Sequence, residues 1–381
     1  MPKRDLSPAT LAAQALAWPD PQHHGLVPSI HPSASYARAP DGSYPGGHSY
    51  SRDQNPTFDA PEALLAALEG GTKALLFASG MAAATTIFET LPPRAHVLVP
   101  RHMYWTIRGW LQALHDRGAI ELEAYDNDDA DHLASLLRKD HTALVWVETP
   151  SNPLGKLTDI ETTVGLAHHA GAKVVADGTT ATPVLCQPLS LGVDIVMHSA
   201  TKQLNGHADV LAGALVTANP DDPMWQAIEH ERGYRGAVLG PFEAWLLLRG
   251  MRTLFLRVPA ACRGANRVAQ MLVAHAGVDE VYYPGLPDHP GHDIARRQMR
   301  YGFGSMLSFR PAGGEARARA VMNRLNVFRD ATSLGGLESL VEHRARIEGQ
   351  RSPLPADLLR LSIGIEDSDD LIADLEQALS I

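Results

Sequence analysis

The chain has 381 residues, of which 45% are hydrophobic and 20% charged, and its formal net charge is −10. This composition is typical of a globular protein with a large core, and it disfavours nucleic acid or an anionic membrane as a partner because both require a basic surface. Cys186 and Cys262 are too few for a disulfide framework, so we expect a reducing, cytoplasmic location. No apolar run approaches the roughly 20 residues that a membrane-spanning helix needs.

The N-terminal part combines a short helix with a long irregular segment. Residues 6–18 are Ala-rich and amphipathic without a clear cleavage pattern after them, so we interpret them as a helix and not as a signal peptide. Residues 19–61 are rich in Pro, Gly, Ser, His and Tyr and show no sustained period, which predicts an extended arm. An arm of this length is often functional, or it lies on a neighbouring subunit.

From Pro61 onward, short apolar runs alternate with helical patterns. The first helix, PEALLAALEGG, has a proline in its first turn and Gly-Gly at its end. The alternation predicts an α/β fold with a mostly parallel sheet that is covered on both faces. Strands are expected at 74–78, 95–99, 143–147, 173–176, 194–197 and 213–217, and helices at 82–90, 106–117, 130–139 and 160–170.

The C-terminal third predicts a second domain. Residues 241–277 form one long helical pattern, which Pro259 is expected to kink or break. Strands are expected at 305–309 and 359–365, and a closing helix begins at Ser368. The predicted organisation is an arm over residues 1–60, a large domain over 61–245, and a linking helix with a C-terminal domain over 246–381.

Common catalytic signatures are absent from the sequence. It contains no G-x-x-x-x-G-K-[ST] phosphate loop, no G-x-G-x-x-G after a strand, no H-E-x-x-H and no G-x-S-x-G. Adjacent histidines on a helix do not face one another, so we interpret the pairs at 23–24 and 168–169 as solvated surface residues and predict no metal site.

Polar residues directly follow several of the predicted strands. Lys202 follows the strand at 194–197, Asp177 follows KVVA, and Asn152 follows ALVWV. Gly80 and Met81 lie between a strand and a helix, where backbone N–H groups can bind phosphate. Open α/β sheets bind ligands at the carboxyl ends of their strands. One ligand that needs an amine, an acid and an anion site together is pyridoxal 5′-phosphate (PLP).

This pattern also explains a lysine in a buried setting. Lysine is rarely buried without a partner, but an amine tied up as an imine with the PLP aldehyde is not buried as a free ammonium. The acid would keep the ring nitrogen of PLP protonated, and the helix N-terminus would take its phosphate.

Six segments, in order along the chain, resemble the Cys/Met-metabolism family of PLP enzymes, which are the transsulfuration enzymes. They are YSRDQNPT (50–57), FASGMAA (77–83), ETPSNP (148–153), DGTTATP (177–183), HSATKQLNGHAD (198–209) and SLGGLESL (333–340). The resemblance implies an aspartate-aminotransferase-like (fold type I) large domain, a smaller α+β C-terminal domain and the extended N-terminal arm.

The resemblance implies how PLP is held. Lys202 would form the Schiff base and later shuttle protons, and Asp177 would pair with the pyridine nitrogen. Arginine suits the phosphate because its planar fork binds two oxygens at once. The implied phosphate ligands are Ser199, Thr201, the backbone N–H groups of Gly80 and Met81, and Tyr50 and Arg52 of the adjacent subunit.

The resemblance also implies a substrate site and an assembly. Tyr104 would stack on the cofactor ring and take part in acid–base steps, and Asn152 would lie near the ring hydroxyl and the substrate carboxylate. Arg360 would hold the α-carboxylate with Ser333 nearby. In an apolar strand its guanidinium needs an anionic partner. The implied partners are a small amino-acid substrate and further copies of the chain, as a dimer with shared sites assembled into a tetramer.

Each assignment has a simpler structural alternative. Arg52 is also compatible with a solvated loop charge, and Asp177 with a capped turn. Tyr104 and Met81 are compatible with core positions, and residues 333–336 with a turn.

Four departures from the family pattern concern substrate choice more than cofactor binding. Residues 105–107 are Trp-Thr-Ile where the family often has Gly-Gly-Thr, and Gly178 replaces an asparagine. Ala208 replaces a serine, and EHRARIEG at 342–349 replaces a segment that carries HPA and Thr-His.

The reaction that the resemblance implies is elimination or replacement at the γ- (or β-) carbon of a sulfur amino acid, of the cystathionine γ-lyase or γ-synthase type. The SLGG sequence favours γ-acting members, because the β-lyases often carry Trp after that Ser. O-acylhomoserine sulfhydrylase, cystathionine β-lyase and methionine γ-lyase remain alternatives, and Gln54 resembles the sulfhydrylase branch. A non-catalytic PLP-fold binding or regulatory protein is the alternative from another class, since fold does not fix function.

Overall fold

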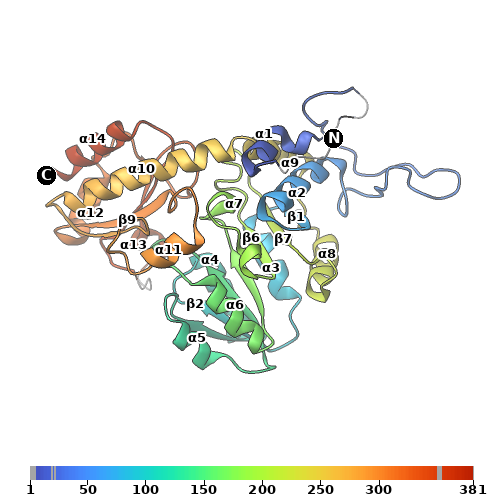
Figure 1. Cartoon of the computed structure of the whole chain (residues 1–381), viewed down its shortest axis with the longest axis horizontal. Helices are drawn as coiled ribbons and strands as arrows, with labels where there is room; N and C mark the ends of the chain where they lie inside the picture. Colours follow the sequence, from blue (N-terminus) through green and yellow to red (C-terminus); the bar gives the residue numbers. More distant parts are fainter. Residues whose placement is uncertain (1–5, 19, 21–22, 350–353, 381) are drawn as a thin grey trace. The chain divides into compact units, whose positions relative to one another are not determined.

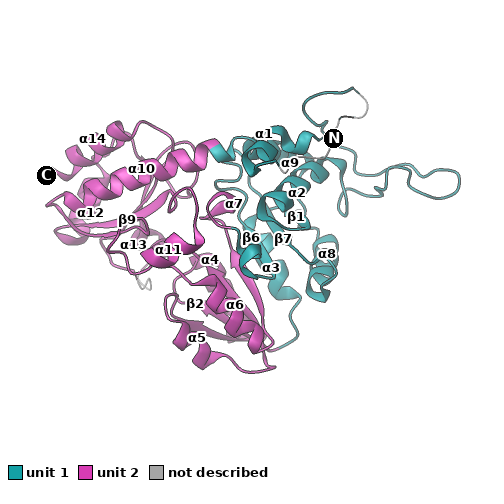
Figure 2. Cartoon of the chain, in the orientation of Figure 1, with its two compact units in different colours: residues 1–93, 187–255 teal, residues 94–186, 256–381 magenta. Residues whose placement is uncertain are grey.

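The computed structural model describes residues 6–18, 20, 23–349 and 354–380. The chain forms two compact units, each built from two stretches of sequence (Figure 2). Unit 1 comprises residues 1–93 and 187–255, and unit 2 comprises residues 94–186 and 256–381. The domain boundaries expected after residues 60 and 245 stay predictions.

Unit 1 contains three neighbouring strands in the order β1-β7-β6, with antiparallel pairing between β1 and β7 and between β6 and β7. Strand β7 is the middle strand of the three, and its last residue, Thr217, lies opposite both Lys73 of β1 and Ile195 of β6. The elements of this unit are α1 (Pro8–Gln14), η1 (Ala15–Ala17), α2 (Pro56–Glu69), β1 (Lys73–Phe77), α3 (Gly80–Glu89), η2 (Pro188–Leu191), β6 (Ile195–His198), β7 (Gly213–Thr217), α8 (Pro223–Arg235) and α9 (Pro241–Met251).

Helix α2 begins five residues before the predicted position. The Asn55 side chain caps the helix by accepting the N–H of Thr57 at 2.8 Å, and Pro56 occupies the first turn. This Asn-Pro pair is a stronger start signal than Pro61, which lies inside α2. In the described residues between α1 and α2, the only strand pairing is an isolated bridge of Ser35 with Tyr50, and Figure 1 shows this segment as a long stretch of irregular chain.

The first part of unit 2 is a set of parallel strands in the order β5-β4-β2-β3. Helices α4, α5 and α6 connect these strands, as the alternating pattern predicted. Strand β3 was not predicted, because its glutamates interrupt the apolar run at 120–125. The elements are β2 (Ala95–Pro100), α4 (Trp105–Asp116), β3 (Ile120–Tyr125), α5 (Ala130–Leu136), β4 (Thr142–Glu148), α6 (Ile160–His169), β5 (Lys173–Asp177) and α7 (Thr182–Leu185).

The second part of unit 2 is a five-stranded sheet in the order β10-β11-β12-β9-β8. Its core joins strand residues such as Phe309 and Leu361 to Val268, Val321 and Leu375 of three helices. The elements are α10 (Leu254–Ala274), β8 (Val278–Tyr282), α11 (His292–Gln298), β9 (Met306–Pro311), α12 (Gly314–Met322), β10 (Arg329–Asp330), β11 (Leu340–His343), α13 (Arg344–Glu348), β12 (Leu359–Ser362) and α14 (Ser368–Leu379).

The long helical pattern at 241–277 is two helices, and the break does not fall at the proline. Helix α9 ends at Met251 and α10 begins at Leu254, while Pro259 lies inside α10. A proline removes one helical hydrogen bond. The buried face of α10, with Ala265 and Leu272 in the core, offsets that loss.

The α/β fold class, with a mostly parallel sheet and a separate smaller sheet, is confirmed. Among the described helices, none is long and apolar enough to cross a membrane.

Candidate active site

Lys202 lies in a tight turn that follows β6. Its N–H donates to the carbonyl of Ser199 at 3.1 Å, and its own carbonyl accepts the N–H of Gly206 at 2.8 Å. Gly206 has φ +74°, which favours glycine at this position. The lysine side chain is half-buried, and its backbone is fixed at both ends of the turn.

Ser199 packs against the N-terminus of α3. A Cβ added to Gly80 would lie 2.8 Å from the Ser199 Cβ, so only glycine allows this approach. Ser79 caps the helix and accepts the N–H of Ala82 at 3.0 Å. The first N–H groups of a helix lack intrahelical partners and carry partial positive charge. The helix end and a serine hydroxyl therefore adjoin, as a phosphate site requires.

Two further predicted phosphate ligands lie in unit 1 near these elements in sequence. Met81 is the second residue of α3 and is half-buried, so it is not a core position. The Thr201 hydroxyl donates to the carbonyl of Ala212 at 3.1 Å and accepts its N–H at 2.9 Å. To donate to a phosphate oxygen, this hydroxyl would have to give up its bond to the Ala212 carbonyl.

Tyr50 and Arg52 are exposed residues of the N-terminal arm. The Arg52 guanidinium lies 5.4 Å from the centre of the Tyr50 ring, and its Nε lies 3.7 Å from a carboxylate oxygen of Asp53. The exposed pair is compatible with both interpretations of the arm, a solvated charge or a contribution to a neighbouring subunit.

Asp177 ends β5 and is buried. Its Oδ1 accepts the N–H of Thr179 at 2.9 Å, so the capped-turn interpretation holds for one carboxylate oxygen. Asp177 lies opposite Glu148 in the register of β4 and β5. Two buried carboxyl groups therefore end adjacent strands.

Glu148 connects two predicted site residues. One carboxylate oxygen accepts the N–H of Tyr104 at 2.6 Å, and the other accepts the N–H of Asn152 at 2.8 Å. Burial and the negative charge of Asp177 raise the pKa of Glu148 to about 8, against the lowering effect of the two N–H groups and of Arg108. Sequence reasoning gave Glu148 no role. A carboxylate at the end of an apolar strand was the available signal.

Arg360 on β12 lies at the centre of a second set of contacts. Its guanidinium donates to the Asn152 side-chain oxygen at 3.3 Å and to the Ser333 carbonyl at 2.5 Å, and it pairs with Glu342 at 2.7 Å. Burial lowers the pKa of Arg360 to about 10, although Glu342 acts in the opposite direction. The expected anionic partner is therefore present within the protein, and the residue stays charged near neutral pH.

The divergent segment EHRARIEG extends this set into a chain of alternating charges. Arg344 donates to Glu342 and to Glu348, both at 2.6 Å, and Arg108 lies 3.8 Å from Glu348. Arg344, Glu342 and Arg360 are all buried. These residues replace the family pattern with ion pairs that fix the surroundings of Arg360.

Ser333 has φ +96°, and Gly335 donates its N–H to the Ser362 hydroxyl at 2.9 Å. The segment at 333–336 is thus a turn that also presents a carbonyl to Arg360. Among the other departures, Trp105 is 39% exposed at the start of α4, and Ala208 is exposed with φ +56°.

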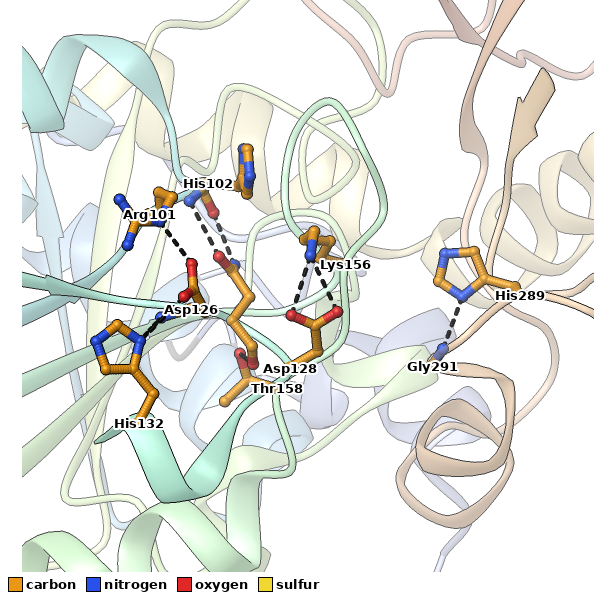
Figure 3. A network of polar contacts seen from close by, with 10 residues as sticks. Arg101, His102, Asp126, Asp128, His132, Lys156, Thr158, His289 and Gly291 are labelled. Carbon is orange, nitrogen blue, oxygen red and sulfur yellow. Dashed lines mark hydrogen bonds and ion pairs between the residues drawn. The ribbon is translucent and has the colours of Figure 1, made fainter. Parts of the chain in front are cut away.

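Asn127 holds the loop that leads into Tyr104. Its side chain accepts the N–H of His102 at 3.0 Å and donates to the His102 carbonyl at 2.8 Å. Figure 3 shows this loop with Arg101 beside Asp126, which also contacts His132. Burial, followed by nearby cations, lowers the pKa of His102. Polar contacts thus fix the backbone two residues before Tyr104.

The two pairs of adjacent histidines are surface residues. Residues 23–24 and 168–169 are exposed, and the described part of the chain contains no group of three or more side chains that could hold a metal ion. Cys186 and Cys262 are buried and are not joined in a disulfide.

The structure therefore groups the predicted residues within each unit. In unit 1 it brings Gly80 against Ser199, a short turn from Lys202. In unit 2 it joins Asn152, Arg360 and Ser333 directly and Tyr104 through Glu148, with Asp177 opposite.

The chain belongs to the Cys/Met metabolism family of PLP-dependent enzymes, whose family model matches residues 9–380. It is 43% identical over 378 residues to the cystathionine γ-synthase of Mycobacterium tuberculosis, covering 98% of this chain and 96% of that protein. It is 39% identical over 341 residues to the cystathionine γ-lyase of Bacillus subtilis, covering 87% and 89% of the two chains.

Solved structures agree with this assignment. The cystathionine γ-synthase of Xanthomonas oryzae pv. oryzae, solved in complex with cystathionine, superposes with a TM-score of 0.94 at 36% identity, covering 99% of this chain and 98% of that chain. The predicted family, fold and PLP dependence are confirmed.

The residues present fit this cofactor. The close approach of Gly80 to Ser199 leaves helix N–H groups and a hydroxyl side by side for a phosphate, and a buried carboxylate ends β5 for a ring nitrogen. When bound, PLP supplies an aldehyde for attachment to an amine and a ring that accepts electrons released at the substrate Cα.

Proposed function

We propose that this enzyme acts at the γ-carbon of a homoserine-derived or sulfur-containing amino acid and that its main reaction is γ-replacement, as in cystathionine formation. Support comes from relatives named cystathionine γ-synthase, which match almost the whole chain at 43% identity, against 39% for a γ-lyase. γ-Elimination is the alternative within the same chemistry.

The observation that best supports binding of an amino-acid substrate is the environment of Arg360. The Arg360 guanidinium is 3% exposed and held in one orientation by Asn152, Ser333 and Glu342, and we assign it to the substrate α-carboxylate as a fixed positive charge. Binding at this point would place the Cα of the substrate at a constant position for proton transfer.

We assign the cofactor to residues of the family motifs. Lys202 attaches it, Asp177 keeps its ring nitrogen protonated, and Tyr104 and Asn152 contact its ring. The phosphate ligands are Ser199, Thr201, Gly80 and Met81, with Tyr50 and Arg52 of a neighbouring subunit.

Lys202 carries the acid–base work in this proposal. Once released by the substrate, its Nζ accepts the proton from Cα and moves a proton at Cβ, so its free amine must be neutral in the site. The phenol of Tyr104 is the second candidate proton donor or acceptor. Arg360 and Asn152 hold the α-carboxylate during these transfers.

We also propose that the enzyme is a cytoplasmic homo-oligomer, a dimer with shared active sites assembled into a tetramer. The exposed arm residues Tyr50 and Arg52 support sharing, because nothing buries them within unit 1. The absence of a disulfide between the two cysteines is compatible with a reducing compartment.

The test is reductive trapping followed by product analysis. Borohydride treatment of the purified yellow protein should remove its visible absorption, and peptide mass spectrometry should find the pyridoxyl group on Lys202. Lys202→Ala should show neither the borohydride-sensitive visible absorption nor the pyridoxyl label. Lys139→Ala, which changes an exposed lysine, should show both. A colourless protein that stays colourless with added PLP, or a label on another lysine, contradicts the assignment.

Products then distinguish the reactions. An O-acylhomoserine with cysteine should yield cystathionine, and cystathionine alone should yield 2-oxobutyrate slowly. Pyruvate from cystathionine would identify β-elimination and overturn the proposed γ-chemistry.

A further inference from the structure

Glu148 is the only described residue whose side chain accepts hydrogen bonds from the backbones of both Tyr104 and Asn152. Tyr104 precedes α4, and Asn152 lies in the loop after β4, so the two N–H groups come from different segments. Glu148 itself ends β4 and is 3% exposed. A single buried carboxylate thus ties together two loops.

We propose that Glu148 is a positioning residue, a two-point clamp whose carboxylate fixes the backbone of Tyr104 and Asn152 and thereby the two side chains they carry. The importance of these side chains rests on the proposed function, but the clamp is a property of the chain alone. It acts through other residues and touches neither substrate nor cofactor in this proposal.

Only an ionised carboxylate satisfies both loops. Each of its oxygens accepts one N–H, and charge-assisted bonds of this kind are shorter and stronger than neutral ones. A glutamine offers one accepting oxygen, and its NH₂ group would face a backbone N–H. Glu148→Gln therefore releases one loop while keeping the size of the side chain.

Asn152 is also held by a second contact, through its side chain. The Asn152 side-chain oxygen accepts from Arg360 at 3.3 Å. Asn152 is therefore held at its backbone N–H by Glu148 and at its side-chain amide by Arg360. The side chain of Tyr104 does not cap α4. The backbone N–H of Tyr104 donates to Glu148 instead, and this bond holds the residue that precedes the helix. Loss of the clamp should therefore change the positions of both residues without creating a cavity in the core.

Charged groups on the adjacent elements shift the pKa of Glu148 in opposite directions. Asp177 on β5 faces it in register and raises its pKa together with burial, while Arg108 on α4 lowers it. A proton on either oxygen displaces an N–H donor, so the clamp should loosen as pH falls through about 8. A positive charge beside Asp177 would favour the ionised, closed clamp.

The experiment is amide hydrogen exchange on the cofactor-free protein, with peptides that cover residues 101–107 and 149–155. Glu148→Gln should lower the protection factor at Tyr104, Asn152 or both by about tenfold or more, with little change in β5. Glu161→Gln, which alters an exposed glutamate in the first turn of α6, is the matched control and should leave both amides unchanged. Wild-type protection at both amides in Glu148→Gln overturns the proposal.

A second measurement uses the unmodified chain and does not require the variant to fold. In wild-type protein, protection factors at the two amides should rise between pH 6.5 and pH 9 after correction for intrinsic exchange. Wild-type protection at Tyr104 and Asn152 that is no greater than for an amide without a hydrogen bond overturns the proposal if the variant cannot be purified.

In the cofactor-loaded protein, Glu148→Gln should raise the KM for the amino-acid substrate and the dissociation constant of PLP, while Lys202 still takes the pyridoxyl label. If labelling fails in wild type but the amide effects appear, the clamp stands and the proposed function fails. If labelling succeeds and the amides are unaffected, the clamp fails and the function stands.

Discussion

At the scale of single residues, a buried contact near Lys202 joins His198 to Glu69. Nε2 of His198 and Oε1 of Glu69 lie 2.6 Å apart, and both side chains are fully buried. In the part of the chain that the structure describes, Glu69 Oε2 and His198 Nδ1 have no hydrogen-bond partner. The pair therefore has no substitute partner if one member is removed, and His198 ends the strand that leads to Lys202.

We expect Glu69→Ala to lower the free energy of unfolding by about 3 kcal/mol, because it leaves a buried imidazole without its partner. Glu69→Gln should cost less, since an amide oxygen can still accept from the imidazole. Urea unfolding of the cofactor-free protein measures both values. A loss below about 0.5 kcal/mol for Glu69→Ala would show that the site relaxes or admits water.

At the scale of elements, proline position was the poorest guide to helix limits. Pro61 and Pro259 both lie inside helices, α2 and α10, although the pattern placed a start at one and a kink or break at the other. One lost hydrogen bond is a small term beside the burial of a whole helical face. The strand limits were closer to prediction, because continuous apolar runs mark buried parallel strands.

Helix α14 provides a testable case of tertiary support for a loop. The buried Asp374 accepts backbone N–H groups of Asn326, Val327 and Phe328 at 2.8–3.2 Å. Asp374→Ala should lower the free energy of unfolding by about 2–4 kcal/mol, since three donors lose a charged acceptor.

Glu376→Gln, two residues along the same helix and exposed, should stay within about 0.5 kcal/mol of wild type. Urea unfolding followed by circular dichroism compares the two variants. Equal midpoints would contradict the view that α14 fixes this loop.

At the scale of the whole molecule, the arm is the segment whose role a single chain does not explain. It is long and irregular, and Leu26 within it is 92% exposed. An exposed aromatic and arginine, Tyr50 and Arg52, at the end of such a segment suit contact with a second copy of the chain.

Hybrid oligomers test this assembly. Arg52→Ala and Lys202→Ala proteins should each be inactive or nearly so, but verified hybrid dimers should recover about half of the wild-type activity, because one of two shared sites is intact. Arg38→Ala, which changes another exposed arginine of the arm, is the control and should keep near wild-type activity by itself, because its Lys202 and Arg52 are both intact. No recovery in verified hybrids would show that each site is built from one chain.

Much of the candidate site was predicted from local sequence. Lys202, Asp177 and Asn152 were predicted because polar residues directly follow apolar strands, and the resemblance to the family implied their roles. The contacts of Glu148, Glu69 and Arg344 were not found. A carboxylate in a motif, a helix-terminal glutamate and an arginine in a divergent segment give no local sign of the group they bind.

The sequence by itself determined the family, the α/β class and the residue types at the strand ends, since these depend on local period, composition and motif order. Only the tertiary structure decided which side chains share a hydrogen bond. The reason is distance along the chain: Tyr104 and Glu148 are 44 residues apart, Glu69 and His198 are 129, and Asn152 and Arg360 are 208. Such pairs meet through the packing of whole strands and helices, which no local pattern encodes.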